Sequence, residues 1–291
     1  IDLINSDHQL NFGRPGLYGN RASNIILQNS DLIISVGARL SIPMIGYVQD
    51  EFARKAKIIQ VDIDKNELNK IKRINSLKLN IGAKEFFNTL IRKKITYKKS
   101  DLSQWVKYSK NLLSKFPHIE NKTHKDKNGF INTYNFINKF CNHLTGNECI
   151  VTDMGVGLLS GHQVMKLKKK QRMMTSTGLG EMGYGLPGAI GASFASGRGE
   201  ILCFHSDGGM MMNLQELQTI DHYKLPIKTF VFNNDGYLMI KHTQKNLFGG
   251  KYTAVNKETD VSCPNFKKVA NAFNMKYFYI KTWQEFNKKI P

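Results

Sequence analysis

Short apolar runs alternate along this chain with stretches whose apolar residues recur at helical spacing. The runs are typical of buried strands, and the stretches between them are typical of amphipathic helices. Alternation of strand and helix predicts parallel sheets whose crossover connections are helical. We therefore expect an α/β fold with two doubly wound parallel-sheet (Rossmann-like) domains, the first of them incomplete. The predicted strands are residues 32–36, 57–63, 149–152, 172–175, 201–205 and 227–232.

The composition divides the chain into three parts. Residues 1–95 hold the first alternating unit, and residues 129–291 hold the second. Residues 96–128 are polar and rich in lysine, so we expect a linker with some helix there. The chain starts in a polar segment without a methionine and stops just after a predicted helix. These ends lead us to expect a fragment whose last domain is truncated at its end.

The formal net charge is +19, from 42 Lys and Arg against 23 Asp and Glu. Such an excess is found in proteins that bind nucleic acid. The lysines are spread along the whole chain, however, and no zinc-finger spacing, RNA-binding motif or recognition-helix pattern accompanies them. A basic composition with solvated lysines explains the charge better than a nucleic-acid partner. A non-catalytic basic nucleic-acid-binding module stays as a remote alternative.

No apolar run approaches the roughly 20 residues that a membrane helix needs, and the N-terminal residues do not read as a signal peptide. The four cysteines, Cys141, Cys149, Cys203 and Cys263, show no CxxC spacing. We interpret them as buried free thiols rather than a disulfide framework or a zinc site. These features lead us to expect a cytoplasmic protein with no membrane partner.

Two polar residues follow consecutive predicted strands of the second unit. Asp207 ends one strand and Asn234 ends the next. A crossover helix returns the chain to the same side of a parallel sheet, so both strand ends lie on one edge. Oxygen ligands suit Mg²⁺, and a helix that begins after Gly208 and Gly209 favours an anion, so a metal-bound diphosphate is expected here. The alternative is that Asp207 caps a helix and Asn234 lies in a turn, with nothing bound.

Several motifs around these residues resemble a known family. "SDGG" (206–209) and "NN" (233–234) resemble the Gly-Asp-Gly to Asn-Asn signature of thiamine diphosphate (ThDP) enzymes, with Ser206 in place of the first glycine. "TSTGLGEMGYGLPGAIGA" (175–192) and "MNLQELQT" (212–219) are similar to the acetolactate synthase large subunits of that family. The resemblance implies the diphosphate-binding domain of such an enzyme.

The first unit resembles the same branch. "NSDLIISVGARL" and "AKIIQVDIDKNEL" are similar to the second part of the central domain of these flavin-containing enzymes. The resemblance makes Asp62 and Asp64 candidate ligands of an FAD ribose, and turn formation is the alternative for both. Residues 39–43 depart from the family's "SRFDDR"-type segment, which weighs against FAD.

The resemblance also assigns site residues. The side chains of Asp207 and Asn234 and the backbone carbonyl of Gly236 would ligate Mg²⁺. Met182 stands where the family has the bulky apolar residue that bends ThDP into its V shape, although an ordinary core methionine is the alternative. The implied cofactor-binding residues are Gly155, Gly157, Gly180, Met182, Asp207, Gly208, Gly209, Asn234, Gly236, Tyr237 and Met239.

Some positions depart from the family pattern. Val156 and Gly157 replace a Gln-His pair near the diphosphate, so backbone amides near Gly155 and Gly157 are expected to substitute for it. Thr243 aligns with a tryptophan that shapes the acceptor pocket, so the acceptor is not indicated. The family's catalytic glutamate belongs to an N-terminal pyrimidine-binding domain, for which we find no counterpart in these 291 residues.

The function implied is a ThDP- and Mg²⁺-dependent 2-oxo acid carboligase or decarboxylase, similar to acetolactate synthase. The resemblance implies a homodimer or homotetramer whose active sites lie at subunit interfaces. An alternative keeps ThDP but transfers the acyl group to a keto-sugar or another acceptor in cell-surface polysaccharide synthesis. Without the catalytic glutamate, residues 1–291 alone are expected to be inactive.

Overall fold

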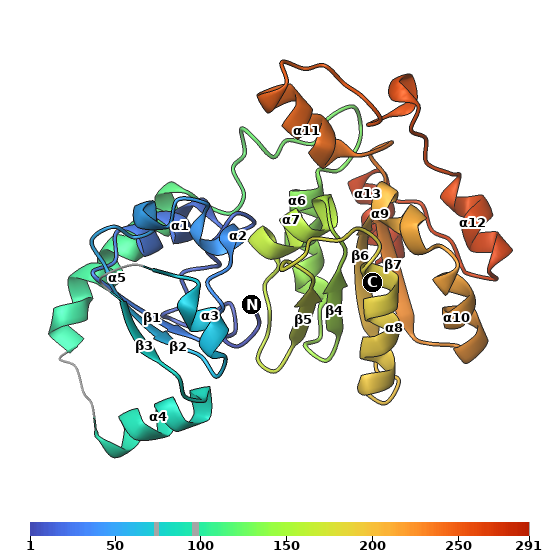
Figure 1. Ribbon diagram of the computed structural model, residues 1–291. Helices are drawn as coiled ribbons and strands as arrows, with labels where there is room; N and C mark the ends of the chain where they lie inside the picture. Colours follow the sequence, from blue (N-terminus) through green and yellow to red (C-terminus); the bar gives the residue numbers. More distant parts are fainter. Residues whose placement is uncertain (73–75, 95–98, 291) are drawn as a thin grey trace. The chain divides into compact units, whose positions relative to one another are not determined.

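The computed structural model describes residues 1–72, 76–94 and 99–290 (Figure 1). The chain forms two compact units: residues 12–118, and residues 1–11 together with 119–291. Each unit contains one parallel sheet with helices beside it. This arrangement confirms the predicted α/β fold with two parallel sheets.

The unit of residues 12–118 is built on a three-stranded sheet in the order β1-β2-β3. In its register Ile34 lies beside Ile59, and Ile59 lies beside Leu77. The unit contains α1 (Arg21–Gln28), β1 (Leu32–Val36), α2 (Ile42–Ile45), η1 (Gln49–Glu51), β2 (Lys57–Val61), α3 (Lys65–Asn69), β3 (Ser76–Leu79), α4 (Ala83–Arg92) and α5 (Lys99–Lys115).

The two faces of this sheet differ in burial. Ile33 and Ile58 point to a core that Leu40, Ile45 and Phe52 complete. On the opposite face the outward side chains are about half exposed: Leu32 49%, Ile34 48% and Leu77 56%. Parallel sheets are usually covered on both faces. Within the described part of this unit, the second face has only partial cover.

Helix α5 packs on α1, where Trp105, Leu112 and Phe116 join Ile26 in a small apolar cluster. Trp105 and Leu112 therefore lie on one face of α5, and Phe116 follows directly after the helix. We expected a linker with some helix at 96–128; α5 is a helix in this range, and it lies in the compact unit of residues 12–118. The predicted boundary at residues 95 and 96 lies outside the described residues, and the limits 1–95, 96–128 and 129–291 stay predictions.

The other unit is built on a four-stranded parallel sheet in the order β5-β4-β6-β7. It contains α6 (Thr133–Phe140), η2 (Cys141–His143), β4 (Cys149–Thr152), α7 (Val156–Val164), β5 (Arg172–Thr175), α8 (Gly185–Ala195), β6 (Ile201–Ser206), α9 (Asp207–Met210), η3 (Met211–Asn213), α10 (Glu216–Tyr223), β7 (Ile227–Phe232), α11 (Leu238–Leu247), η4 (Lys257–Thr259), α12 (Phe266–Ala272) and α13 (Trp283–Lys289).

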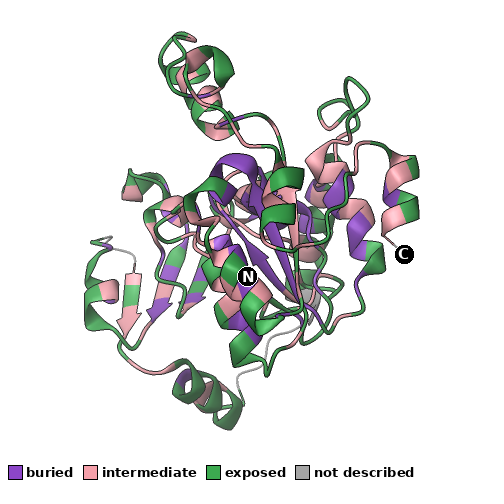
Figure 2. Cartoon of the chain, turned by 90° about the vertical axis from the view of Figure 1, so that its right-hand side faces the viewer, coloured by how far each residue is buried: buried purple, intermediate pink, exposed green. Residues whose placement is uncertain are grey.

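Helices cover both faces of this sheet, as in a doubly wound domain. Ile150 and Phe204 pack with residues of α6, α7 and α13 on one face. Val151 and Cys203 pack with Ala189 of α8 on the other face. Figure 2 shows the buried residues concentrated in these central strands. Packing on both faces therefore fixes the position of each strand, and with it the place of the residues that follow the strand ends.

All four cysteines are free thiols: Cys141 and Cys203 are buried, and Cys149 and Cys263 are half-buried. None of the helices in the described ranges combines the length and the apolar character needed to cross a bilayer.

Candidate cofactor site

The carboxyl ends of the four parallel strands of the second unit lie on one edge of its sheet. The segments that follow them are Asp153–Gly155 after β4, Ser176–Tyr184 after β5, Asp207–Gly209 after β6 and Asn233–Tyr237 after β7. Ligand sites of doubly wound sheets are found at this edge. Most of the predicted site residues fall in these four segments.

Asp207 is fully buried where β6 ends. Its Oδ2 accepts hydrogen bonds from the backbone N–H groups of Asn234 (2.8 Å) and Gly236 (3.1 Å). Its Oδ1 accepts one from the N–H of Gly208 (2.8 Å). Burial raises the pKa of this carboxyl, and the backbone donors act in the opposite direction. The structure thus brings the three predicted metal ligands, Asp207, Asn234 and Gly236, together.

The side-chain amide oxygen of Asn234 accepts no hydrogen bond from the described residues. This oxygen, Oδ1, is buried. Leaving a buried acceptor unsatisfied costs about 1–3 kcal/mol, so such an atom needs an explanation. A cation bound beside Asp207 would use this oxygen, and the donor set therefore fits Mg²⁺.

The expected metal site depends on a single carboxylate. The described residues contain no group of three or more His, Cys, Asp or Glu side chains that could hold a metal ion. An amide oxygen and a backbone carbonyl would have to complete the protein ligands, as the sequence analysis expects of Asn234 and Gly236. Two diphosphate oxygens would supply further hard ligands to a six-coordinate ion.

Glycines at this edge let backbone and side chains approach closely. A Cβ at Gly208 would lie 2.3 Å from the ring of Tyr237 and 3.3 Å from Cε of Met182. A Cβ at Gly236 would lie 2.1 Å from the backbone oxygen of Val255, and its φ of 139° also requires glycine. These contacts bring Met182, Gly208 and Tyr237 together beside the Asp207 carboxylate.

Residues 153–291 match "Thiamine pyrophosphate enzyme, C-terminal TPP binding domain", and residues 1–90 match "Thiamine pyrophosphate enzyme, central domain". The chain belongs to the thiamine pyrophosphate (ThDP) enzymes. The edge that collects Asp207 and Asn234 is therefore part of a ThDP-binding domain.

Relatives in this family carry the name acetolactate synthase. The chain is 33% identical to the large subunit of acetolactate synthase isozyme 1 of Escherichia coli (strain K12) over 275 residues, which is 94% of this chain and 47% of that protein. It is 31% identical to the acetolactate synthase large subunit of Porphyra purpurea over 291 residues, which is 99% of this chain and 48% of that protein. The chain spans about half the length of the curated relatives it matches.

The turn that carries Met182 is held from both sides in this ThDP-binding domain. The N–H of Gly180 donates to the carbonyl of Ser176 (2.8 Å), and Nδ2 of Asn213 donates to the carbonyl of Gly183 (2.9 Å). Met182 is half-buried, whereas Leu179 is 90% exposed. Met182 therefore lies near Gly208 in a turn held by two hydrogen bonds, and its role as a wedge against the cofactor stays a prediction.

The first turn of α7 has a different partner from the one we expected. The N–H groups of Val156 (2.9 Å) and Gly157 (3.5 Å) point to Oγ of Ser206, which is buried. Gly155 adopts a φ of 100°, and a Cβ there would lie 2.5 Å from the same Oγ. The hydroxyl of Ser206 thus occupies the amides that were expected to substitute for the missing Gln-His pair. Roles of Gly155 and Gly157 toward the diphosphate stay predictions.

Met239 and Thr243 lie in α11, which begins directly after Tyr237. Oγ1 of Thr243 donates to the carbonyl of Met239 (3.1 Å), and the Thr243 side chain is exposed. The structure thus keeps Met239 next to the β7 end of the site. Its contact with a cofactor stays a prediction.

Three residues near the site were not predicted. Asp153 and His205 are fully buried, and Oδ2 of Asp153 lies 3.4 Å from Nδ1 of His205. Burial acts to lower the pKa of His205, but Cys203 and Asp153 outweigh it and raise the pKa to about 10. Burial and then the Asp207 carboxylate raise the pKa of the Cys263 thiol to about 11. The sequence could have indicated Asp153 as a site residue, because it directly follows a predicted strand that ends at the same edge of the sheet.

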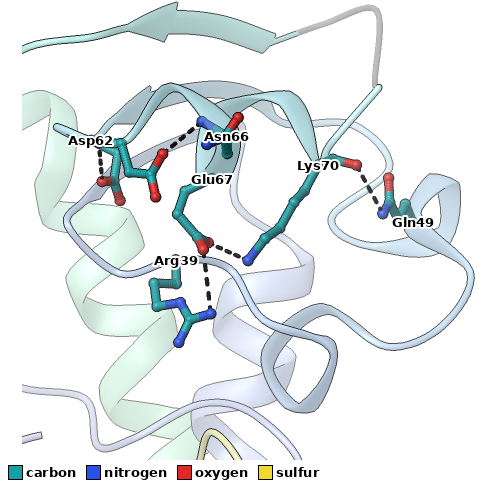
Figure 3. Close-up of polar contacts among 7 residues, drawn as sticks. Arg39, Gln49, Asp62, Asn66, Glu67 and Lys70 are labelled. Carbon is teal, nitrogen blue, oxygen red and sulfur yellow. Dashed lines mark hydrogen bonds and ion pairs between the residues drawn. The ribbon is translucent and has the colours of Figure 1, made fainter.

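The strand-end acids of the other unit make only local bonds (Figure 3). Asp62 accepts from the N–H of Asp64 (3.0 Å), and Asp64 caps α3 by accepting from the N–H of Asn66 (2.8 Å). Glu67 pairs with Arg39 (3.3 Å) and with Lys70. These bonds are those of the turn alternative, and FAD binding through Asp62 and Asp64 stays a prediction.

Proposed function

We propose that this chain supplies the Mg²⁺- and diphosphate-binding part of a ThDP-dependent enzyme that cleaves a 2-oxo acid and joins the product to an acceptor carbonyl. The observation that carries the proposal is that the buried Asp207 carboxylate accepts the backbone N–H of Asn234, a residue whose buried Oδ1 has no hydrogen-bond partner among the described residues. The names of the relatives support a carboligase of the acetolactate synthase kind.

Each residue has a distinct task in this proposal. Asp207 supplies the negative charge for Mg²⁺, and Asn234 and the carbonyl of Gly236 supply neutral oxygens. Met182, whose methyl group lies near Gly208, would support a bent conformation of the cofactor. When bound, ThDP supplies the carbon that attacks the 2-oxo group and accepts the electrons left by CO₂.

The acceptor and the assembly belong to the same proposal. Pyruvate or 2-oxobutyrate would be the acceptor of an acetolactate synthase. An exposed threonine stands at 243, where the family has tryptophan, and transfer to a keto-sugar or another acceptor is the alternative. A substrate screen that compares pyruvate self-condensation with keto-sugar acceptors distinguishes the two. We further propose a cytoplasmic homo-oligomer whose active site takes its catalytic glutamate from a domain outside residues 1–291.

Calorimetric titration with ThDP tests the proposal. We expect binding in the presence of Mg²⁺ that is lost with a chelator, and far weaker binding of thiamine, which lacks the diphosphate. Asp235→Asn is the matched control, because Asp235 is the exposed acid next to Asn234. This variant should bind ThDP with the affinity of the wild type. The absence of any Mg²⁺-dependent binding by the wild type would rule out the proposed function.

A further inference from the structure

A pair of buried ionisable side chains lies directly beneath the cofactor edge. Asp153 follows β4, His205 lies in β6 next to Ser206, and both are fully buried. Their Oδ2 and Nδ1 atoms are 3.4 Å apart. Such a pair gains little stability over apolar residues of the same volume, because both side chains lose their hydration. Its position next to the cofactor edge calls for a role other than stability.

The pair holds the beginning of α8. Oδ1 of Asp153 accepts a hydrogen bond from the N–H of Gly185 (3.1 Å), the first residue of that helix. A Cβ at Gly185 would lie 2.3 Å from Nε2 of His205 and 3.0 Å from Cβ of Asp153. The helix start therefore packs directly on both side chains. It can come this close only because residue 185 is glycine.

The same helix start carries the wedge residue of the proposed site. Met182 lies three residues before Gly185 in the sequence, and its Cε lies near Gly208. Asp153 also faces Gly209, where a Cβ would lie 1.7 Å from Oδ2. One carboxylate thus contacts both the segment that carries Met182 and the segment that follows Asp207.

We propose that Asp153 and His205 form a positioning pair that sets the place of the Met182 turn relative to the Gly208–Gly209 segment. This inference rests on the proposed function for its catalytic meaning. The pair does not touch the reacting atoms. The pair fixes Gly185, the first residue of α8, and the turn that carries Met182 leads directly into Gly185.

NMR of the 291-residue chain with ¹³C-labelled methionine methyl groups tests the pair, and Met182→Leu identifies the Met182 signal. Asp153→Ala removes the acceptor for Gly185, whereas Asp153→Asn keeps it. Glu148→Gln is the matched control, because Glu148 is also a buried carboxylate flanking β4 and accepts from the N–H groups of Thr145 (2.6 Å) and Gly146 (2.9 Å) at the opposite end. Titration with Mg²⁺ and inorganic pyrophosphate measures the metal end separately.

We expect Asp153→Ala to shift and broaden the Met182 methyl signal, and Asp153→Asn to restore it in large part. Glu148→Gln should leave the signal unchanged, and pyrophosphate affinity should stay within about threefold of the wild type in all variants. An unchanged Met182 signal in Asp153→Ala, an equal shift in Glu148→Gln, or a joint loss of pyrophosphate binding would overturn the proposal. If Asp153→Ala does not fold, His205→Gln must shift the same signal, and no shift overturns it.

The methyl signal is read on the free protein, so the test does not depend on ThDP binding. A wild-type chain that fails to bind Mg²⁺ and ThDP would refute the proposed function alone. A Met182 turn that is independent of Asp153 would refute the positioning pair alone.

Discussion

The two sheets of this chain end in acidic residues at the same topological place, yet the two edges differ in what those acids do. Asp207 is fully buried, and it accepts backbone hydrogen bonds from the segment after the neighbouring strand. Asp62 and Asp64 accept hydrogen bonds from residues two positions further along their own chain. Asp207 therefore links the ends of two neighbouring strands, where we propose the cation site, whereas Asp62 and Asp64 form hydrogen bonds within their own turn.

The polar groups near each edge show the same contrast. Oδ1 of Asn234 is buried and has no hydrogen-bond partner in the part of the chain that the structure describes. By contrast, Nδ2 of Asn80, from the segment after β3, donates to the carbonyls of Asp62 (3.0 Å) and Ile63 (2.9 Å). A buried amide oxygen without a partner can serve as a ligand when a cation binds. Nε2 of Gln60 in β2 is also buried without a partner among the described residues, so what distinguishes Asn234 is that its backbone N–H binds the buried Asp207 carboxylate.

The largest expected effect is a difference in ThDP affinity between variants of the acids at the two sheet edges, Asp207 and Asp62. Asp207→Ala should abolish Mg²⁺-dependent ThDP binding, a loss of about 100-fold or more, because it removes the only carboxylate among the proposed ligands. Asp62→Ala should leave that binding within about twofold of the wild type. Calorimetric titration of both variants measures this. Equal affinities for the two variants would break the comparison.

A smaller effect should distinguish the two asparagines. Asn234→Ala should weaken ThDP binding about tenfold, since a neutral ligand is lost, and it should not destabilise the free protein, because its oxygen has no partner there. Asn80→Ala should lower stability by about 1 kcal/mol and leave ThDP binding intact. Calorimetry combined with thermal unfolding gives both numbers. Finding that Asn234→Ala destabilises the free protein as much as Asn80→Ala does would contradict this account.

The smallest effect concerns the helix cap at the second edge. Asp64→Ala removes the acceptor for the N–H of Asn66 and should cost about 1 kcal/mol of unfolding free energy, the usual value for an N-cap. Denaturant unfolding measures it, and ThDP affinity serves as the internal control. A change in ThDP affinity with no change in stability would show that Asp64 acts on a ligand instead of a helix.

Much of the fold could be predicted because apolar runs decide which segments become strands. Strands β4, β5 and β7 have the predicted limits, and β6 is one residue longer than predicted. Strand β2 ends at Val61, two residues early, because Asp62 and Asp64 form a turn. Strand β3 was missed, since Ser76–Leu79 is short and two of its four residues are polar. The range of α5 was predicted to be a linker with some helix, because the apolar face of this helix becomes evident only where it packs on α1.

The site divides in the same way. Asp207, Asn234 and Gly236 could be brought together in advance, because one crossover relates β6 and β7. The Asp153–His205 contact could not, since it depends on β4 lying beside β6 in the order β5-β4-β6-β7. The bond of Ser206 to Val156 depends on the same strand order. Pairing between strands that are not consecutive is therefore what the sequence left undetermined.

The central claim is that Asn234 and Asp207 hold a divalent cation that carries a diphosphate. The most direct measurement is NMR of the side-chain amide groups in the isotope-labelled chain, with ThDP and paramagnetic Mn²⁺ in place of Mg²⁺. We predict that the Asn234 amide signal broadens beyond detection, because the bound ion would lie next to it. An Asn234 signal that stays sharp while ThDP and Mn²⁺ are bound would contradict the account.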